Sequence, residues 1–325
     1  MKLIICGNGF DRNHGLHTGY CSYRAYLEKN APNILEKFEL FPFLNSRKIS
    51  EKWKDVEDTL RINAEAFVQM LNSYQLFESE ENVIECGIDI EEWMNFLFAF
   101  TGELFYKWLQ EIDITKLIPK REIEELFEDA VFITFNYTDT LENVYGISKE
   151  RIVHIHGNLL QVNQQECIGQ DIFSVFSTIE EAECYNKPIV KKEQWNSYVI
   201  RKEIQFGAPV KVENLMNLIG VDNIPDKDIR EYVSEVLPCL IKNIENNIPV
   251  LRKFIDGKNI EEVIVLGHSL NGPDDLYYTE CLLPLYREKK WTFYWHRHEN
   301  SEEDLCEKKL FCQRHKIANC EYREW

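Results

Sequence analysis

The chain has 325 residues, of which 44% are hydrophobic and 13% aromatic, and its 55 acidic and 37 basic side chains give a formal net charge of −18. This composition is typical of a soluble globular protein, and the acidic balance argues against broad nucleic-acid binding, because a phosphate backbone binds to a basic surface. No apolar run reaches the roughly 18 residues of a membrane helix, and the first apolar run is too short for a signal peptide, so we expect a cytoplasmic protein without a membrane partner.

The 10 cysteines form no recognisable metal or redox motif. No two of them have the C-x-x-C spacing of zinc ribbons and thioredoxin-like sites. In a chain that we expect in the cytoplasm, they are most simply reduced thiols buried in the core.

Apolar runs alternate with amphipathic patterns in the first half of the chain. A buried strand is predicted at residues 2–6, and amphipathic helices are predicted at 51–74 and 93–108. Further buried strands are predicted at 130–135 and 152–155.

The second half continues this alternation. A helix bent at Pro238 is predicted at 229–244, and a strand after it breaks into a loop at Gly267. The remaining predicted elements are a helix at 274–288, a strand at 291–295, a helix that begins at Ser301 and a strand near Ile317.

Strands that alternate with helices predict an α/β fold, in which a mostly parallel sheet of about six strands is covered by helices on both faces. The helical stretches at about 20–128 and 159–258 interrupt this pattern. We interpret them as insertions that form a helical cap on a single domain spanning 1–325.

Four of the predicted strands run directly into polar, turn-forming loops. In an open α/β sheet the carboxyl ends of the strands are the edge where ligands bind, close to the point where the strand order reverses. The four loops therefore predict one ligand site, and they begin at Gly7, Asn136, His156 and Gly267.

The first loop, Gly7-Asn8-Gly9, would let the backbone approach a ligand closely. It is not the G-x-G-x-x-G fingerprint, because Arg12 stands at the sixth position, and the chain has no G-x-x-x-x-G-K-[ST] phosphate loop. A plain strand-to-helix turn is the alternative, but the polar residues that follow, Asp11 among them, favour a site.

The other three loops each offer one reactive or polar group. His156 stands at a strand end, where its near-neutral pKa would suit acid–base chemistry. Asn136 could orient a ligand or cap the next helix, and Ser269 could contact a phosphate or ribose or act as a helix N-cap.

Two candidates lie outside these loops. Glu57 lies at the edge of the apolar stripe of its predicted helix, where a carboxylate is either catalytic with a raised pKa or part of an ion pair within the cap. His296, His298 and Glu299 have metal-ligand spacing, which would suit a nuclease, but a nuclease needs a basic groove that the net charge of −18 does not favour.

These residues resemble those of the AbiH family of bacterial phage-defence (abortive infection) proteins. The resemblance spans nearly the whole chain and involves four stretches in the same order, namely "GNGFDRNHGLHTGY", "WKDVE", "FNYTDTLENVYG" with "VHIHGN", and "VLGHSL" with "YY" after it.

The same elements are similar, more distantly, to sirtuin-like NAD-binding domains. Residues 7–11 resemble the sirtuin G-A-G-x-S turn, His156 with Gly157 resembles the catalytic His-Gly pair, and residues 267–270 resemble G-T-S-L. The departures are the missing C-x-x-C zinc module, which argues against protein deacetylation, His17 in place of a proline, and Thr138 in place of an aspartate.

The resemblance implies a Rossmann-like, sirtuin-like sheet and a phage-defence protein that binds NAD and cleaves it at the nicotinamide glycosidic bond. NAD is then a substrate, no metal is expected, and self-association and a phage-derived trigger stay open. A nucleotide-binding sensor that holds NAD or ADP-ribose without turnover is the alternative. The implied catalytic residues are His156, Asn136, Asp11 and Glu57, and the implied cofactor-binding residues are Gly7, Asn8, Gly9, Phe10, Asp11, Gly267, His268, Ser269 and Asp274.

Overall fold

The computed structural model describes residues 1–40, 48–54, 56–57, 59–60, 95–159, 205–206, 242, 244–270, 272, 274–295 and 301–325. The chain divides into two compact units, each built from separate stretches of sequence. The first unit consists of 1–19, 111–158 and 244–325, and the second consists of 20–110 and 159–243.

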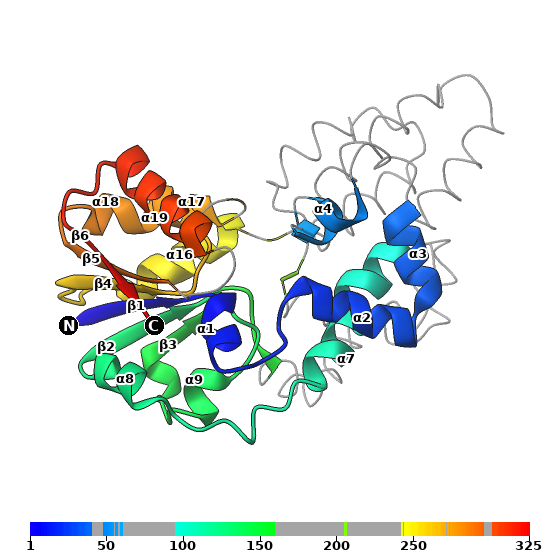
Figure 1. Ribbon diagram of the computed structural model, residues 1–325. Helices are drawn as coiled ribbons and strands as arrows, with labels where there is room; N and C mark the ends of the chain where they lie inside the picture. Colours follow the sequence, from blue (N-terminus) through cyan, green and yellow to red (C-terminus); the bar gives the residue numbers. More distant parts are fainter. Residues whose placement is uncertain are drawn as a thin grey trace, which may run out of the picture. The chain divides into compact units, whose positions relative to one another are not determined.

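The first unit is built on a six-stranded sheet in which every neighbouring pair of strands is parallel. The predicted α/β fold with a parallel sheet is therefore confirmed. In the order β3-β2-β1-β4-β5-β6, successive strands run outward from β1 on one side and from β4 on the other, which is the order of doubly wound dinucleotide-binding folds. The strands (Figure 1) are β1 (Lys2–Cys6), β2 (Ala130–Thr134), β3 (Ile152–His154), β4 (Glu262–Leu266), β5 (Lys290–Trp295) and β6 (Cys320–Glu324).

The apolar strand sequences bury both faces of this sheet. Along β1, Leu3 and Ile5 belong to one core cluster and Ile4 and Cys6 to the other, as the alternation of side chains along a strand requires. Helices cover both faces (Figure 1), which explains why the central strands have no polar face.

The first core cluster lies under the helices α16 (Ile244–Ile255), α17 (Asp275–Tyr277), α18 (Leu283–Tyr286) and α19 (Ser301–His315), together with the π-helical turn η8 (Tyr278–Leu282). The second lies under α1 (Asn8–Asn13), α8 (Arg121–Glu124), the 3-10 turn η3 (Glu125–Phe127) and α9 (Thr140–Asn143). A further 3-10 turn, η4 (Lys149–Arg151), leads into β3.

The described part of the second unit is helical and has an aromatic core. Its elements are α2 (Tyr20–Asn30), α3 (Pro32–Leu40), α4 (Ile49–Lys54), the π-helical turn η2 (Ala99–Glu103) and α7 (Leu104–Gln110). Tyr23 is fully buried at the centre of this core, and its hydroxyl donates a hydrogen bond to the carbonyl of Phe100. The rings packed within reach of Tyr23 include Trp53, Phe105, Trp108 and Phe206.

The boundaries of the helical segments differ from those expected. Residues 111–128 and 244–258 belong to the first unit, since α8 and α16 pack their apolar side chains on its sheet. The last strand begins at Cys320, because the chain turns at Lys316 with φ of 56° and Ile317 is buried before the strand starts. Most of the predicted helix at 229–244 and most of the one at 51–74 lie outside the described residues.

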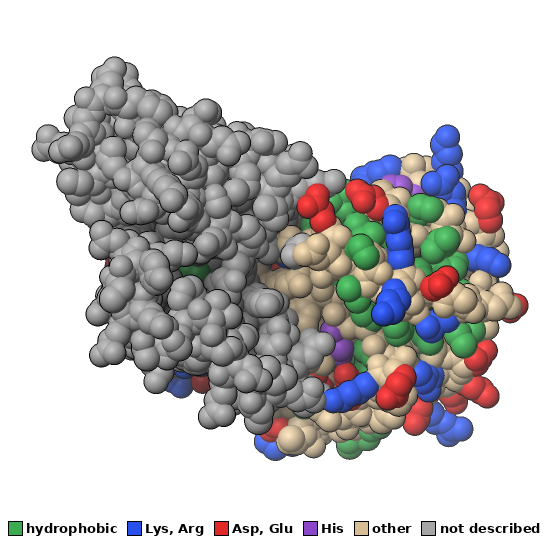
Figure 2. Space-filling model, turned by 180° about the vertical axis from the view of Figure 1, so that it is seen from behind, with side chains coloured by type: hydrophobic (Ala, Val, Ile, Leu, Met, Phe, Trp, Pro, Cys, Tyr) green, Lys and Arg blue, Asp and Glu red, His purple; other side chains and the backbone are tan. Residues whose placement is uncertain are grey.

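Two features of the described residues concern possible partners, namely the apolar character of the helices and the distribution of charge on the surface. Among these residues, no helix combines the length and the apolar character needed to cross a membrane. On the face shown in Figure 2, the Lys and Arg side chains are interspersed with Asp and Glu, so the described residues gather no single basic patch there.

The loops after β1 and β4 touch where the strand order reverses. The Gly9 N–H donates to the carbonyl of Gly267 over 2.7 Å. Gly267 has φ of +61°, and a Cβ there would lie 2.4 Å from the carbonyl carbon of Gly9. Glycine is therefore required at 267 for two reasons, its left-handed backbone and the absence of space for a side chain.

We expect Gly267→Ala to destabilise the protein more than Gly257→Ala. Both residues have left-handed backbones, which costs alanine roughly 1–2 kcal/mol, but nothing lies within 4 Å of a Cβ at Gly257. The clash at Gly267 adds about 1–3 kcal/mol for the forced shift of packed backbone. Urea unfolding followed by circular dichroism measures the difference, and equal losses for the two variants would contradict the tight contact.

Candidate functional site

The Asp274 carboxylate joins two histidines that come from different loops. Its Oδ1 lies 3.1 Å from Nε2 of His156, and its Oδ2 lies 3.4 Å from Nε2 of His268. Both histidines are buried, His156 after β3 and His268 after β4. Because Asp274 precedes α17, this group ties the carboxyl ends of two strands to the start of a helix.

Aromatic rings pack against the two histidines, whose imidazoles are buried. The ring of Phe135 lies 4.1 Å from that of His268 and 5.5 Å from that of His156, centroid to centroid, and the Tyr277 ring lies 5.8 Å from that of His156. A low local dielectric strengthens the attraction between a carboxylate and an imidazole.

Tyr278 fixes the orientation of His268. Its hydroxyl lies 2.9 Å from Nδ1 of His268, and burial raises the pKa of that hydroxyl well above its ordinary value, so that it stays a donor. His268 then accepts at Nδ1, which leaves its N–H on Nε2, the nitrogen that faces Asp274.

The glycine turn after β1 uses its backbone amides within the protein. The Gly7 N–H donates to the carbonyl of Leu266 over 3.1 Å, and the Gly9 N–H donates to that of Gly267. These two amides therefore pack the turn against the loop after β4, whereas the sequence had suggested that they contact a ligand. Asn8 and Ser269 are the predicted binding residues that lie exposed at this contact.

Asp11 is buried and bound by two threonines from the loop after β2. The Thr138 hydroxyl donates to Oδ2 of Asp11 over 2.6 Å, and the Thr140 hydroxyl donates to Oδ1 over 3.0 Å. Burial raises the pKa of Asp11 to about 6, although these hydrogen bonds and one from the Asn136 side chain lower it. Asp11 thus connects the ends of β1 and β2.

Two other predicted residues lie beside this network. Asn136 is buried, and its N–H donates to the hydroxyl of Thr134 over 3.1 Å. Phe10 is 1% exposed and packs in the second core cluster near Phe127, so its side chain contributes to the core.

Glu57 belongs to the second unit, in a buried ion pair. Its Oε2 lies 2.6 Å from Nζ of Lys242, and its Oε1 accepts a hydrogen bond of 2.9 Å from the hydroxyl of Tyr20. Of the two roles considered for Glu57, a catalytic carboxylate or an ion pair within the helical cap, this arrangement is that of the ion pair. His296, His298 and Glu299 lie outside the described residues.

The structure therefore brings the predicted residues of the first unit into two buried polar groups. One contains His156, His268 and Asp274, and the other contains Asp11 and Asn136. Sequence reasoning missed Thr140 and Tyr278. The spacing of two threonines after a strand is a weak signal for the first. The second is one of two adjacent tyrosines, Tyr277 and Tyr278, and the pair "YY" gives no sign of which side chain Tyr278 contacts.

We expect Asp11→Asn to change how stability depends on pH. The pKa of Asp11 is about 6 in the folded protein against an ordinary 3.8, so the unfolded chain ionises first and the folded state loses about 3 kcal/mol as pH rises from about 4 to 7. Asparagine cannot ionise, so this loss disappears. Urea unfolding of wild type and variant at both pH values measures it, and a constant difference between the two proteins across this range would contradict the raised pKa.

Comparison with known proteins agrees with the first of the two resemblances. The family model described as "Bacteriophage abortive infection AbiH" matches residues 3–295, which runs from β1 to the end of β5. No curated protein and no solved structure matches the chain, so the likeness to sirtuin-like domains stays a prediction. The match extends over nine-tenths of the sequence and includes all of the loops described above. The chain belongs to the AbiH family of bacteriophage abortive infection proteins.

Proposed function

We propose that this protein acts in abortive infection by binding NAD⁺ at the carboxyl edge of the first unit's sheet and cleaving its nicotinamide glycosidic bond. The observation that carries the proposal is the group of His156, Asp274 and His268 at this edge, in which two buried histidines face one half-buried carboxylate. A histidine oriented by a carboxylate is the arrangement of a general base.

The strand order supports the dinucleotide part of the proposal. In doubly wound sheets a dinucleotide binds where the strand order reverses, which in this sheet is between β1 and β4. The exposed side chains there, Asn8 and Ser269, are polar and suit phosphate and ribose oxygens. Because the Gly7 and Gly9 amides are engaged within the protein, we assign phosphate contact to Asn8 and Ser269 instead.

The proposed reaction is hydrolysis. The bond between C1′ of the ribose and the nicotinamide nitrogen breaks, nicotinamide leaves with the electron pair, and C1′ develops oxocarbenium character. Water adds to C1′ and gives its proton to His156, while Asn136 orients the water or a ribose hydroxyl. The products are nicotinamide, ADP-ribose and a proton. Asp274 holds the imidazole and stabilises its positive charge as it forms.

We expect purified protein to release nicotinamide from NAD⁺, and His156→Ala to lower the rate by about 100-fold or more, as loss of a general base does. His17→Ala is the matched control, because His17 is exposed in the same unit. Nicotinamide is followed by chromatography, and total NAD is measured in phage-infected cells that express each form, which supplies any trigger. NAD that stays constant in both settings would overturn the cleavage proposal.

We expect Asp274→Asn to lower kcat by about 100-fold and to change KM little, because an amide neither favours the same imidazole tautomer nor stabilises its charge. Asp275→Asn is the control, since Asp275 faces His315 at 3.6 Å instead. Calorimetry with NAD⁺ separates the alternative: binding by wild type without any product would indicate the sensor. An unchanged kcat in Asp274→Asn would remove His156 from the role of base.

A further inference from the structure

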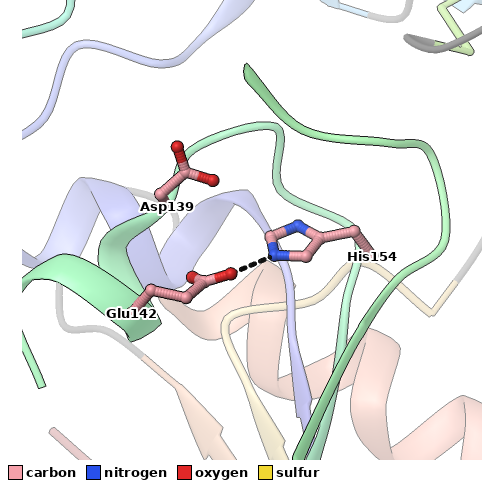
Figure 3. Close-up of side chains that lie close together, drawn as sticks. All are labelled: Asp139, Glu142 and His154. Atoms are coloured by element: carbon pink, nitrogen blue, oxygen red, sulfur yellow. Dashed lines mark hydrogen bonds and ion pairs between the residues drawn. The ribbon is translucent and has the colours of Figure 1, made fainter. Parts of the chain in front are cut away.

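A third polar group lies where β2 and β3 end, and none of its three side chains is assigned to NAD chemistry. It consists of Asp139 and Glu142, which lie three residues apart at the start of α9, and His154, the last residue of β3. One ligand atom from each of the three lies within 4.8 Å of the others. Figure 3 shows the Glu142 carboxylate facing the imidazole of His154, with Asp139 beside them.

Two carboxylate oxygens of this group are buried without a hydrogen-bond partner among the described residues. They are Oδ1 of Asp139, which is 4% exposed, and Oε2 of Glu142, whose side chain is 9% exposed. A buried carboxylate oxygen that has lost water and gained no donor is costly, so its persistence indicates a missing positive partner.

The imidazole of His154 faces an acceptor at each nitrogen. Nε2 lies 2.8 Å from Oε1 of Glu142, and Nδ1 lies 3.3 Å from the carbonyl oxygen of Asn136. A metal-binding histidine commonly donates one N–H to a backbone carbonyl, which leaves its other nitrogen as the ligand. Here that places Nε2 toward the two carboxylates.

The charges of the group also favour a cation. A metal ion binds carboxylates in their ionised form, and two ionised carboxylates carry more negative charge than one imidazole can balance. Lys149, on the 3-10 turn before β3, is exposed.

We propose that Asp139, Glu142 and His154 bind a divalent first-row transition metal, with Mn²⁺ and Zn²⁺ as the ions that suit two carboxylates and one imidazole. Bonds of about 2.1 Å place ligand atoms roughly 3–4 Å apart, so separations of up to 4.8 Å need to shorten by at most about 1–2 Å. The three ligands are different residues from those proposed to act on NAD⁺, and the two sets meet where His154 contacts the backbone carbonyl of Asn136.

The test is Mn²⁺ binding to the full chain after chelator treatment, with free Mn²⁺ measured by electron paramagnetic resonance and Zn²⁺ added as a competitor. A net charge of −18 attracts cations in general, so the control must change charge equally. Glu122→Gln does this, because Glu122 is exposed in the same unit. We expect wild type and Glu122→Gln to bind one Mn²⁺ per chain, and Asp139→Asn and Glu142→Gln to bind it at least about tenfold more weakly.

Thermal unfolding gives a second readout that does not depend on activity. Mn²⁺ should raise the Tm of wild type and of Glu122→Gln, and leave that of the two site variants unchanged. Circular dichroism verifies that each variant folds. If one site variant does not fold, the comparison of the other site variant with the wild type tests the proposal. A wild type without a saturable site for Mn²⁺ or Zn²⁺, or site variants that bind like Glu122→Gln, would overturn the proposal.

Discussion

The backbone contact between Gly9 and Gly267 determines the geometry of the whole carboxyl edge of the sheet. The two residues follow neighbouring central strands, β1 and β4, and approach so closely that a Cβ at either would lie less than 3 Å from the other's backbone. The hydrogen bond from the Gly9 N–H to the Gly267 carbonyl fixes their relative height. Because Asp11 lies two residues after Gly9 and His268 directly follows Gly267, this contact also limits where their side chains can lie.

Polar side chains connect these two loops to the loops that follow β2 and β3. Asp11 reaches from the first loop to Thr138 and Thr140 after β2, and Asp274 connects His268 with His156 after β3. Such groups cost free energy in a low dielectric unless they are paired, so each pairing selects one arrangement of the loops over its alternatives. The edge is therefore held by specific polar contacts, whereas the sheet below it is held by apolar burial on both faces.

The sheet could be predicted from the sequence because apolar runs such as those of β1 and β2 report burial directly. The gathering of polar side chains at this edge was also predictable, since four polar loops follow four such runs. The contacts of each polar side chain could not be predicted, because the spacing of apolar residues shows which face of a helix or strand is buried but not which distant residues lie against it. His156 and Asp274 are 118 residues apart, and Thr140 lies 129 residues from Asp11. The close contact of Gly9 with Gly267 was not predictable for the same reason, since the two glycines lie on different loops.

The two histidines near the end of β3 show how one strand end can serve two sites. His154 and His156 are two residues apart, a spacing that in a continuous strand would place both on the same face. Because β3 ends at His154, the chain turns before His156. His154 then points toward Glu142 on the face covered by α9, and His156 toward Asp274 and Tyr277 on the face covered by α17. The proposed cation site and the proposed base therefore have different side-chain partners, Glu142 for His154 and Asp274 for His156, so a variant of Glu142 leaves the contact of His156 with Asp274 in place.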